Sequence, residues 1–200
     1  MLYKLAHILR DRFGFLWNIV EWLNASVFAL THRAALKKIP EILQEFSDKF
    51  TLRLAEPTDA APLAAFFAEQ PEDSFKFFKP HAFDEKTLSK IIRNKAFLTF
   101  LVLEENKIVG YFFLRCFVNG KCFKGYMVAD AYRGMGIAKL EGFAMNKVNE
   151  ILGLRMFGSI SPENSASLAV AKAVNEVKIL STLENGDYYV EFLPKSKLIA

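Results

Sequence analysis

Cysteine is scarce in this 200-residue sequence, which contains only Cys116 and Cys122. Two cysteines six positions apart, on expected neighbouring strands, provide neither a disulfide framework nor a metal-binding motif. We therefore expect no metal site. The same scarcity favours a reducing, cytoplasmic environment.

The sequence also has no long uninterrupted apolar run and no strong charge of one sign. A membrane-spanning helix needs about 20 predominantly apolar residues, whereas the apolar stretches 13–20 and 22–30 are interrupted by polar side chains. No cleavage-site pattern indicates a signal peptide. The net charge of +4 contains no basic stripe of the kind that nucleic-acid modules carry, so it suits a small anionic ligand better than nucleic acid.

Apolar residues are abundant instead: 52% of the sequence is hydrophobic, and it contains 20 phenylalanines. Such a chain folds into a globular protein. Residues 1–46 read as a separate helical segment with a broad apolar face and basic residues towards its ends. Two interpretations stay open for this segment. It is either a docking helix for a membrane surface or a partner, or a helical layer packed on the main domain or on a second copy in a homodimer.

Residues 51–200 form the second predicted unit, in which short strands alternate with amphipathic helices. Asn119-Gly120 is typical of a tight hairpin, and Gly153 is expected to end a helix. Thr58 or Asp59 is a candidate helix cap. The predicted strands are 51–55, 97–103, 108–117, 121–129, 155–160, 177–183 and 187–193, and the predicted helices follow Asp59, cover 85–94 and 137–152, and run from Ser161 to about residue 174. This order predicts an α+β fold.

One glycine-rich segment, AYRGMGIAKL at 131–140, follows a strand and precedes a helix. Such a turn directs unpaired backbone N–H groups at one point, where the helix dipole favours an anion. Lys139 occupies the third small position of a dinucleotide fingerprint, and the Gly-Lys-Ser/Thr ending of a P-loop is missing. The segment therefore indicates either a different diphosphate site or a tight turn without a ligand.

The strand order, together with the Arg-x-x-Gly-x-Ala pattern of Arg133, Gly136 and Ala138, resembles the GNAT superfamily of acetyl-coenzyme A dependent N-acetyltransferases. The resemblance covers about 51–193 and implies a mostly antiparallel sheet of about seven strands flanked by helices, with coenzyme A as cofactor. It implies a pyrophosphate site at Arg133, Gly134, Met135, Gly136, Ile137 and Ala138. The pantetheine arm would lie between splayed fourth and fifth strands, against Met127, Val128, Ala129, Asn164 and Ser167.

Acetyl transfer to an amine needs a base, a donor for the oxyanion and an acid for the leaving thiolate. The base candidates are Asp130, which is equally a candidate helix cap, and Glu163. Val128 or Ala129 would supply the backbone N–H for the oxyanion, and Ser167, Tyr126 or water would supply the proton. Many family members have a tyrosine acid at the position that Ala171 occupies here, so the acid is not fixed by the resemblance.

The acceptor is expected to be a small primary amine, with an amino sugar or sugar nucleotide ahead of protein N-termini and polyamines. His81 is a candidate acceptor ligand. Phe75 belongs to a cluster that forms either an aromatic pocket with cationic rims or part of the core, and its other members are Phe77, Phe78, Lys76 and Lys79. Tyr188 and Tyr189 should face opposite sides of a strand. An alternative function is a non-catalytic coenzyme A binding module, regulatory or membrane-associated.

Overall fold

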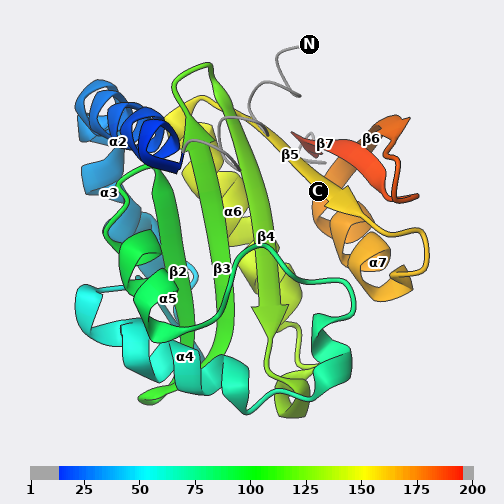
Figure 1. Ribbon diagram of the computed structural model, residues 1–200. Coiled ribbons are helices and arrows are strands. Elements are labelled where there is room, and N and C mark those ends of the chain that lie inside the picture. The colour runs from blue at the N-terminus through cyan, green and yellow to red at the C-terminus, as the bar shows by residue number, and fades with distance from the viewer. Residues whose placement is uncertain (1–13, 196–200) are drawn as a thin grey trace.

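The computed structural model describes residues 14–195, which form a seven-stranded sheet flanked by helices (Figure 1). Residues 1–13 of the expected N-terminal segment lie outside the described residues. The strand order is β1-β2-β3-β4-β5-β7-β6, and all pairings are antiparallel except the parallel pair β4–β5. The strands are β1 (Thr51–Leu54), β2 (Phe97–Glu104), β3 (Lys107–Phe117), β4 (Lys121–Val128), β5 (Arg155–Ile160), β6 (Asn175–Thr182) and β7 (Tyr188–Pro194). The predicted fold class is confirmed.

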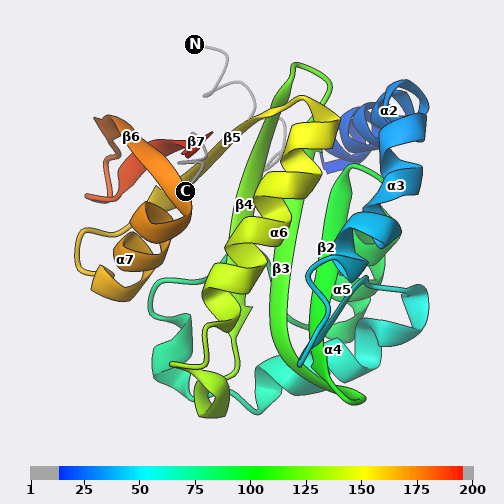
Figure 2. The same cartoon turned by 180° about the vertical axis from the view of Figure 1, so that it is seen from behind.

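Helices cover both faces of the sheet. α4 (Ala60–Ala68) and α5 (Glu85–Ile92) lie on the face seen in Figure 1, and α6 (Ile137–Leu152) and α3 (Arg33–Gln44) lie on the face seen in Figure 2. α2 (Gly14–Thr31) contacts α3 and β3, and α7 (Ser165–Val174) packs against α6 and β6. Three short 3-10 helices, η1 (Pro57–Asp59), η2 (Glu72–Phe75) and η3 (Asp130–Tyr132), complete the described chain.

The alternation of side chains along β3 explains the two cores. Phe112 and Leu114 belong to the apolar cluster on the α6 face, whereas Tyr111 and Phe113 belong to the cluster on the α4 face. Because both faces are covered, β3 reads as an almost continuous apolar run rather than as alternating polar and apolar residues. The buried centre of the sheet therefore lies at β2 and β3.

One predicted helix start is wrong. Ser161-Pro162-Glu163 forms a turn, in which the Asn164 N–H donates to the Ser161 carbonyl, and α7 begins at Ser165. The cap is Asn164, whose side-chain oxygen accepts from the Ser167 N–H at 3.0 Å. Asparagine is among the strongest N-cap residues, and here Asn164 caps the helix in place of Ser161, which was expected to begin it.

Asp59 precedes α4 as expected, but its side chain does not cap that helix. Its two carboxylate oxygens accept from Arg53 at 2.6 and 2.8 Å, and one of them also accepts from the Glu56 N–H. The hydrogen bond from Arg53 lowers the pKa of Asp59, although burial acts in the opposite direction. The carboxylate side chain is only 11% exposed, so this pair joins β1 firmly to the start of α4.

We predict that Asp59→Asn lowers the free energy of unfolding at pH 7 by about 1–2 kcal/mol, since charge-assisted hydrogen bonds to a partly exposed arginine are lost. Because folding lowers the Asp59 pKa, the stabilisation is present above the unfolded pKa of about 3.9 and disappears as the pH falls through the lower folded value. Urea unfolding at pH 7 and in acid measures both effects. Glu150→Gln, which breaks the exposed Lys147–Glu150 pair, is the control and should change stability little.

The described part of the N-terminal segment is divided between two environments. α3 buries Ile39, Ile42 and Leu43 against the domain, where it contacts α6 and β1. Among the α2 residues whose burial is described, residues 15 and 17–31, Phe28 alone is completely buried. Within residues 14–195, none of the helices combines the length and apolar character that crossing a bilayer requires.

Candidate active site

The sheet opens between β4 and β5. These strands share only three pairs, Lys121–Arg155, Cys122–Met156 and Phe123–Phe157, before they separate. The splayed strands that the resemblance implied are therefore present. Figure 1 shows β5 leaving the plane of β4 towards β7 and α7.

The ladder between β3 and β4 determines which backbone groups face this opening. The Ala129 N–H donates to the Val109 carbonyl at 2.9 Å, so the backbone of Ala129 faces β3. In an antiparallel pair the direction alternates along the strand. The N–H groups of Tyr126 and Val128, beyond the last β4–β5 pair, therefore face the opening.

This alternation narrows the expected oxyanion donors. The Ala129 N–H is already used within the sheet, whereas the Val128 N–H faces the gap. The side chains of Met127 and Ala129 are buried in the cluster on the α4 face. The predicted contacts of Met127, Val128 and Ala129 with the pantetheine arm stay predictions. Of the two candidate oxyanion donors, Val128 has the backbone N–H that faces the gap.

The glycine-rich turn lies directly after β4 and ends in α6. Gly134 and Gly136 have φ angles of +80° and +85°, a region that disfavours residues with a Cβ atom. Within the described chain, a Cβ built at either glycine would meet no atom within 4 Å, so space for a ligand is open above both. Gly136 occupies the N-cap position of α6 and offers no side chain to its N–H groups.

The first turn of α6 can accept an anion. The N–H groups of Lys139 and Leu140 donate to the Gly136 carbonyl. Those of Ile137 and Ala138 precede the first bonds within the helix and point out of its positive end. This uncapped start fits a diphosphate, which is the group the coenzyme would place there.

Asp130 and Arg133 lie beside this turn and pair with each other at 2.8 Å. Arg133 also donates to the Ser74 hydroxyl at 2.8 Å, and the Asp130 N–H donates to the Gln70 side chain. Both charged side chains are about half exposed. Asp130 is the first residue of η3 and not the cap of α6. Its carboxylate pairs with Arg133, and the same carboxylate would have to act as the predicted base.

Tyr126 and Ser167 meet on the α7 side of the opening, with their hydroxyl oxygens 3.4 Å apart. Burial raises the pKa of Tyr126, although the contact with Ser167 lowers it. The phenol is therefore protonated at neutral pH and able to donate. Ala171, where the resemblance placed the usual tyrosine, is only 4% exposed within the core. The tyrosine hydroxyl on this side of the opening therefore comes from Tyr126 of β4 and not from a residue of α7.

Two buried ionisable residues near the opening were not singled out from sequence. Glu141 of α6 is fully buried, lies against Gly110, and has no hydrogen-bond partner within residues 14–195. Burial raises its pKa well above the ordinary value, so it is protonated. The sequence contains a signal for this burial, because Glu141 lies four positions after Ile137 and so on the apolar, buried face of α6.

Lys124, next to the last β4–β5 pair, keeps some solvent exposure but is closely surrounded. Its amine donates to the Asn175 side chain at 3.1 Å and lies 3.8 Å from the centre of the Phe192 ring. Burial lowers the pKa of Lys124 to about 7. Nothing in the alternating sequence of β4 distinguishes this lysine from an exposed one.

On the opposite face of the sheet, the segment 71–83 covers the approach to the gap. Phe75 packs on Phe67 and Phe83, and Phe78 lies near Gly125 of β4. Phe77 is 41% exposed, so the phenylalanine cluster divides between core and surface. Lys76 pairs with Glu163 at 3.2 Å, which joins this segment to the loop after β5.

His81 fixes the segment to β3. Its Nδ1 lies 2.8 Å from the Ala82 carbonyl, which can only accept, so Nδ1 carries the proton and Nε2 accepts from the Tyr111 hydroxyl at 2.8 Å. Burial lowers the pKa of His81 and raises that of Tyr111, so both are neutral at pH 7. The Nε2 lone pair of His81 is thereby occupied by the Tyr111 hydroxyl. The predicted contact of His81 with the acceptor stays a prediction.

We predict that Tyr111→Phe loosens segment 71–83, because it leaves the buried Nε2 of His81 without a donor at a cost of about 1–3 kcal/mol. The Michaelis constant for the acceptor should rise several-fold, while coenzyme A affinity stays unchanged. Hydrogen exchange across 71–83 and steady-state kinetics test this. Tyr188→Phe, on the α7 side of the sheet, is the control, and equal exchange in both variants would contradict the prediction.

The last hairpin completes the α4 side of the gap. Tyr189 stacks on Phe157 of β5 with ring centres 5.7 Å apart, and it lies 6.4 Å from Phe123 of β4. Tyr188 packs at the edge of the other core, so the two tyrosines face opposite sides as predicted. Phe123, Phe157 and Tyr189 thus form an aromatic floor where β4 and β5 begin to separate.

The acetyltransferase (GNAT) domain family matches residues 49–175 of the chain. Among curated proteins, none matches it in sequence. Similar solved structures include RimJ of Mycobacterium smegmatis in complex with a coenzyme A disulfide, at 18% identity and a TM-score of 0.63, covering 76% of this chain and 84% of that one. The PaiA N-acetyltransferase of Thermoplasma acidophilum with coenzyme A has 13% identity and a TM-score of 0.62, covering 73% and 99%.

A chimera of the spermidine N-acetyltransferase SpeG from Vibrio cholerae has 21% identity and a TM-score of 0.56, covering 74% of this chain and 96% of that one. At such identities the solved structures establish the fold, and the domain match, which spans more than half of the chain, establishes the family. The open β4–β5 edge and the uncapped start of α6 fit coenzyme A. The chain belongs to the GNAT superfamily and is an acetyl-coenzyme A dependent N-acetyltransferase.

Proposed function

We propose that this enzyme acetylates the primary amine of a small acceptor, and that the acceptor is an amino sugar or a sugar nucleotide. The observation that supports this best is the aromatic floor of Phe123, Phe157 and Tyr189 at the junction of β4 and β5. The partly exposed rings of Phe123 and Tyr189 would pack against a sugar ring or a base, and Phe157, which is only 2% exposed, supports them from the core. The exposed Lys79 of segment 71–83 favours an anionic acceptor over a polyamine, whereas the charge of Lys76 is paired with Glu163.

When bound, acetyl-coenzyme A supplies the acetyl group as a thioester with a thiol leaving group. The N–H groups of Ile137 and Ala138 at the start of α6 would hold its diphosphate. Arg133, which its pairing with Asp130 orients, would support that contact. The side chains of Asn164 and Ser167 at the start of α7 would line the same side of the opening.

The Val128 N–H would donate to the acyl oxygen as negative charge develops there. Tyr126, kept protonated by burial, would donate its proton to the departing sulfur, with Ser167 orienting the phenol. An alkyl amine has a pKa of about 10 and is mostly protonated at neutral pH. Asp130 or Glu163, each exposed at the mouth of the gap, would accept the proton that the amine must lose.

The test is release of free thiol from acetyl-coenzyme A in the presence of an amine panel. We expect the highest kcat/KM with amino sugars or their nucleotide conjugates, and lower values with spermidine and with peptides that have a free N-terminus. Similar structures are named for acetylation of a ribosomal protein N-terminus and of spermidine, so these two acceptors are the main competitors. A preference for either one would overturn the proposed acceptor.

The turnover itself is tested against the alternative, coenzyme A binding without turnover, because Ala171 is buried at the position where many family members carry an acid. Calorimetry separates the two functions. Binding of coenzyme A without thiol release for any amine would support the non-catalytic module, whereas turnover with any amine would exclude it.

We also propose a cytoplasmic location for the enzyme, in keeping with its two free, buried cysteines.

A further inference from the structure

The outward side of α2 is apolar. Six large side chains at helical spacing point away from the domain and are between 38% and 76% exposed, namely Phe15, Ile19, Trp22, Leu23, Val27 and Leu30. A surface helix normally buries its apolar side and exposes its polar one. α2 buries Phe28 but leaves these six large apolar side chains exposed.

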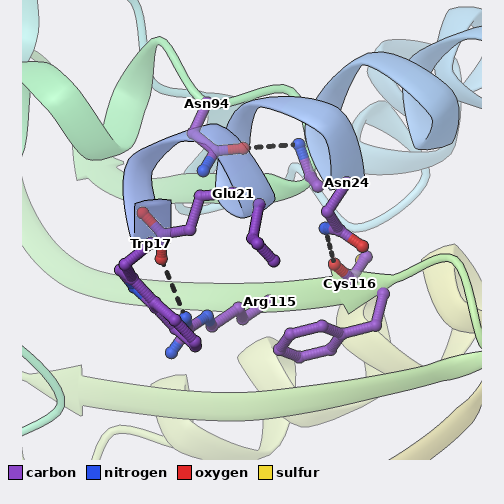
Figure 3. Close-up of a pocket in the computed structure, with 9 residues that line it drawn as sticks. Trp17, Glu21, Asn24, Asn94, Arg115 and Cys116 are labelled. Carbon is purple, nitrogen blue, oxygen red and sulfur yellow. Dashed lines mark hydrogen bonds and ion pairs between the residues drawn. The ribbon is translucent and has the colours of Figure 1, made fainter. Parts of the chain in front are cut away.

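The polar side of α2 is fixed to the domain by specific bonds (Figure 3). Asn24 donates to the Cys116 carbonyl at 2.9 Å and accepts from the Val118 N–H at 3.0 Å, which continues the backbone pairing of β3. Glu21, the only charged residue in the sequence of α2, accepts from Arg115 at 3.0 Å. These bonds prevent the helix from rotating its apolar side inward.

Cations border this apolar face. Lys90 of α5 donates to Asn18 of α2 at 2.9 Å, and Lys86 and Arg93, at the spacing that shares one side of α5, are exposed with it. Arg33 is exposed two residues after the end of α2. A two-fold dimer through α2 would bring two such basic rims together, which is unfavourable.

We propose that α2 lies in the surface of an anionic membrane and holds the enzyme there. The helix is a peripheral anchor: its outward residues enter the boundary between headgroups and acyl chains, and the basic rim attracts the lipid phosphates. Trp22, exposed at 65%, is of the residue type that favours this boundary. The inference concerns the outward side of α2, which contains none of the residues assigned to coenzyme A or to the acceptor, so it does not depend on the identity of the acceptor.

The chain provides its own reporter, because Trp17 and Trp22 are its only tryptophans. Trp17 faces the cavity between α2 and β3, so Trp17→Phe leaves the outward Trp22 as the sole fluorophore. We expect Trp22 of the full chain to be open to acrylamide in buffer. It should become shielded and quenched by brominated lipid when phosphatidylcholine vesicles containing phosphatidylserine are added, and respond much less to pure phosphatidylcholine.

Leu30→Glu should weaken binding to the phosphatidylserine vesicles about tenfold or more, as expected for removing one large inserted side chain and adding a negative charge. Ile179→Glu is the matched control, because Ile179 is 54% exposed on β6, and its binding should equal wild type. Both variants should keep wild-type coenzyme A affinity. Added salt should weaken binding of the wild-type chain.

Three results would overturn the proposal. The first is no flotation of the full chain with phosphatidylserine vesicles, and the second is equal binding by Leu30→Glu and wild type. The third is shielding of Trp22 in lipid-free buffer, because it would mean that a second copy or another segment of the chain already covers the face. Light scattering would then identify a dimer that Leu30→Glu dissociates.

Discussion

Gly136→Ala should weaken coenzyme A binding about a hundredfold, which corresponds to losing one or two charge-assisted hydrogen bonds. Gly136 has a φ of +85° and is the N-cap of α6, so an alanine there must either strain the backbone or change the direction of the first N–H groups. Its Cβ would also enter the open space above the turn. Isothermal titration calorimetry with coenzyme A measures the loss.

Gly186→Ala is a close control for this prediction. Gly186 also has a φ of +85° and open space at its Cβ position, but it lies in the turn between β6 and β7. Both substitutions should therefore cost a similar free energy of unfolding, about 1 kcal/mol. If coenzyme A affinity falls equally in both variants, or in neither, the diphosphate does not rest on the start of α6.

The strands were predictable because local signals agreed with the fold. All seven have boundaries within two residues of the sequence prediction, and the predicted turn at Asn119-Gly120 falls where glycine supplies a positive φ. The glycine turn and the helix after it also follow from short-range chemistry. The start of α7 was missed because two local signals competed, and the asparagine cap lay three residues beyond the serine.

The parts that were not predictable depend on contacts between distant residues. Glu141 approaches β3 only because Gly110 has no side chain, and the two positions are 31 residues apart. The orientation of α2 has a similar origin: its broad apolar face was visible in the sequence, but the bonds of Asn24 to β3 decide that this face points outward. A helical pattern gives the direction of an apolar face relative to its own axis, not relative to the rest of the molecule.

The contact between Tyr126 and Ser167 joins residues 41 positions apart and carries the last prediction. Tyr126→Phe should lower kcat about a hundredfold or more, as expected for removing a general acid. Coenzyme A affinity should stay nearly unchanged, because the diphosphate site is on another element. Ser167→Ala should lower kcat by a smaller factor, since it removes only the group that orients the phenol.

The pH dependence of kcat gives a second measurement of the same proposal. An acid must be protonated to act, so Tyr126 supports turnover below its pKa and loses that role above it. Burial raises this pKa above the ordinary value of about 10. The wild-type rate should therefore rise with pH as the amine and its base lose protons, and show no alkaline decline from Tyr126 below about pH 10.

A wild-type kcat in Tyr126→Phe combined with a large loss in Ser167→Ala would assign the proton to the serine. Wild-type rates in both variants would leave water as the donor and remove Tyr126 from the mechanism.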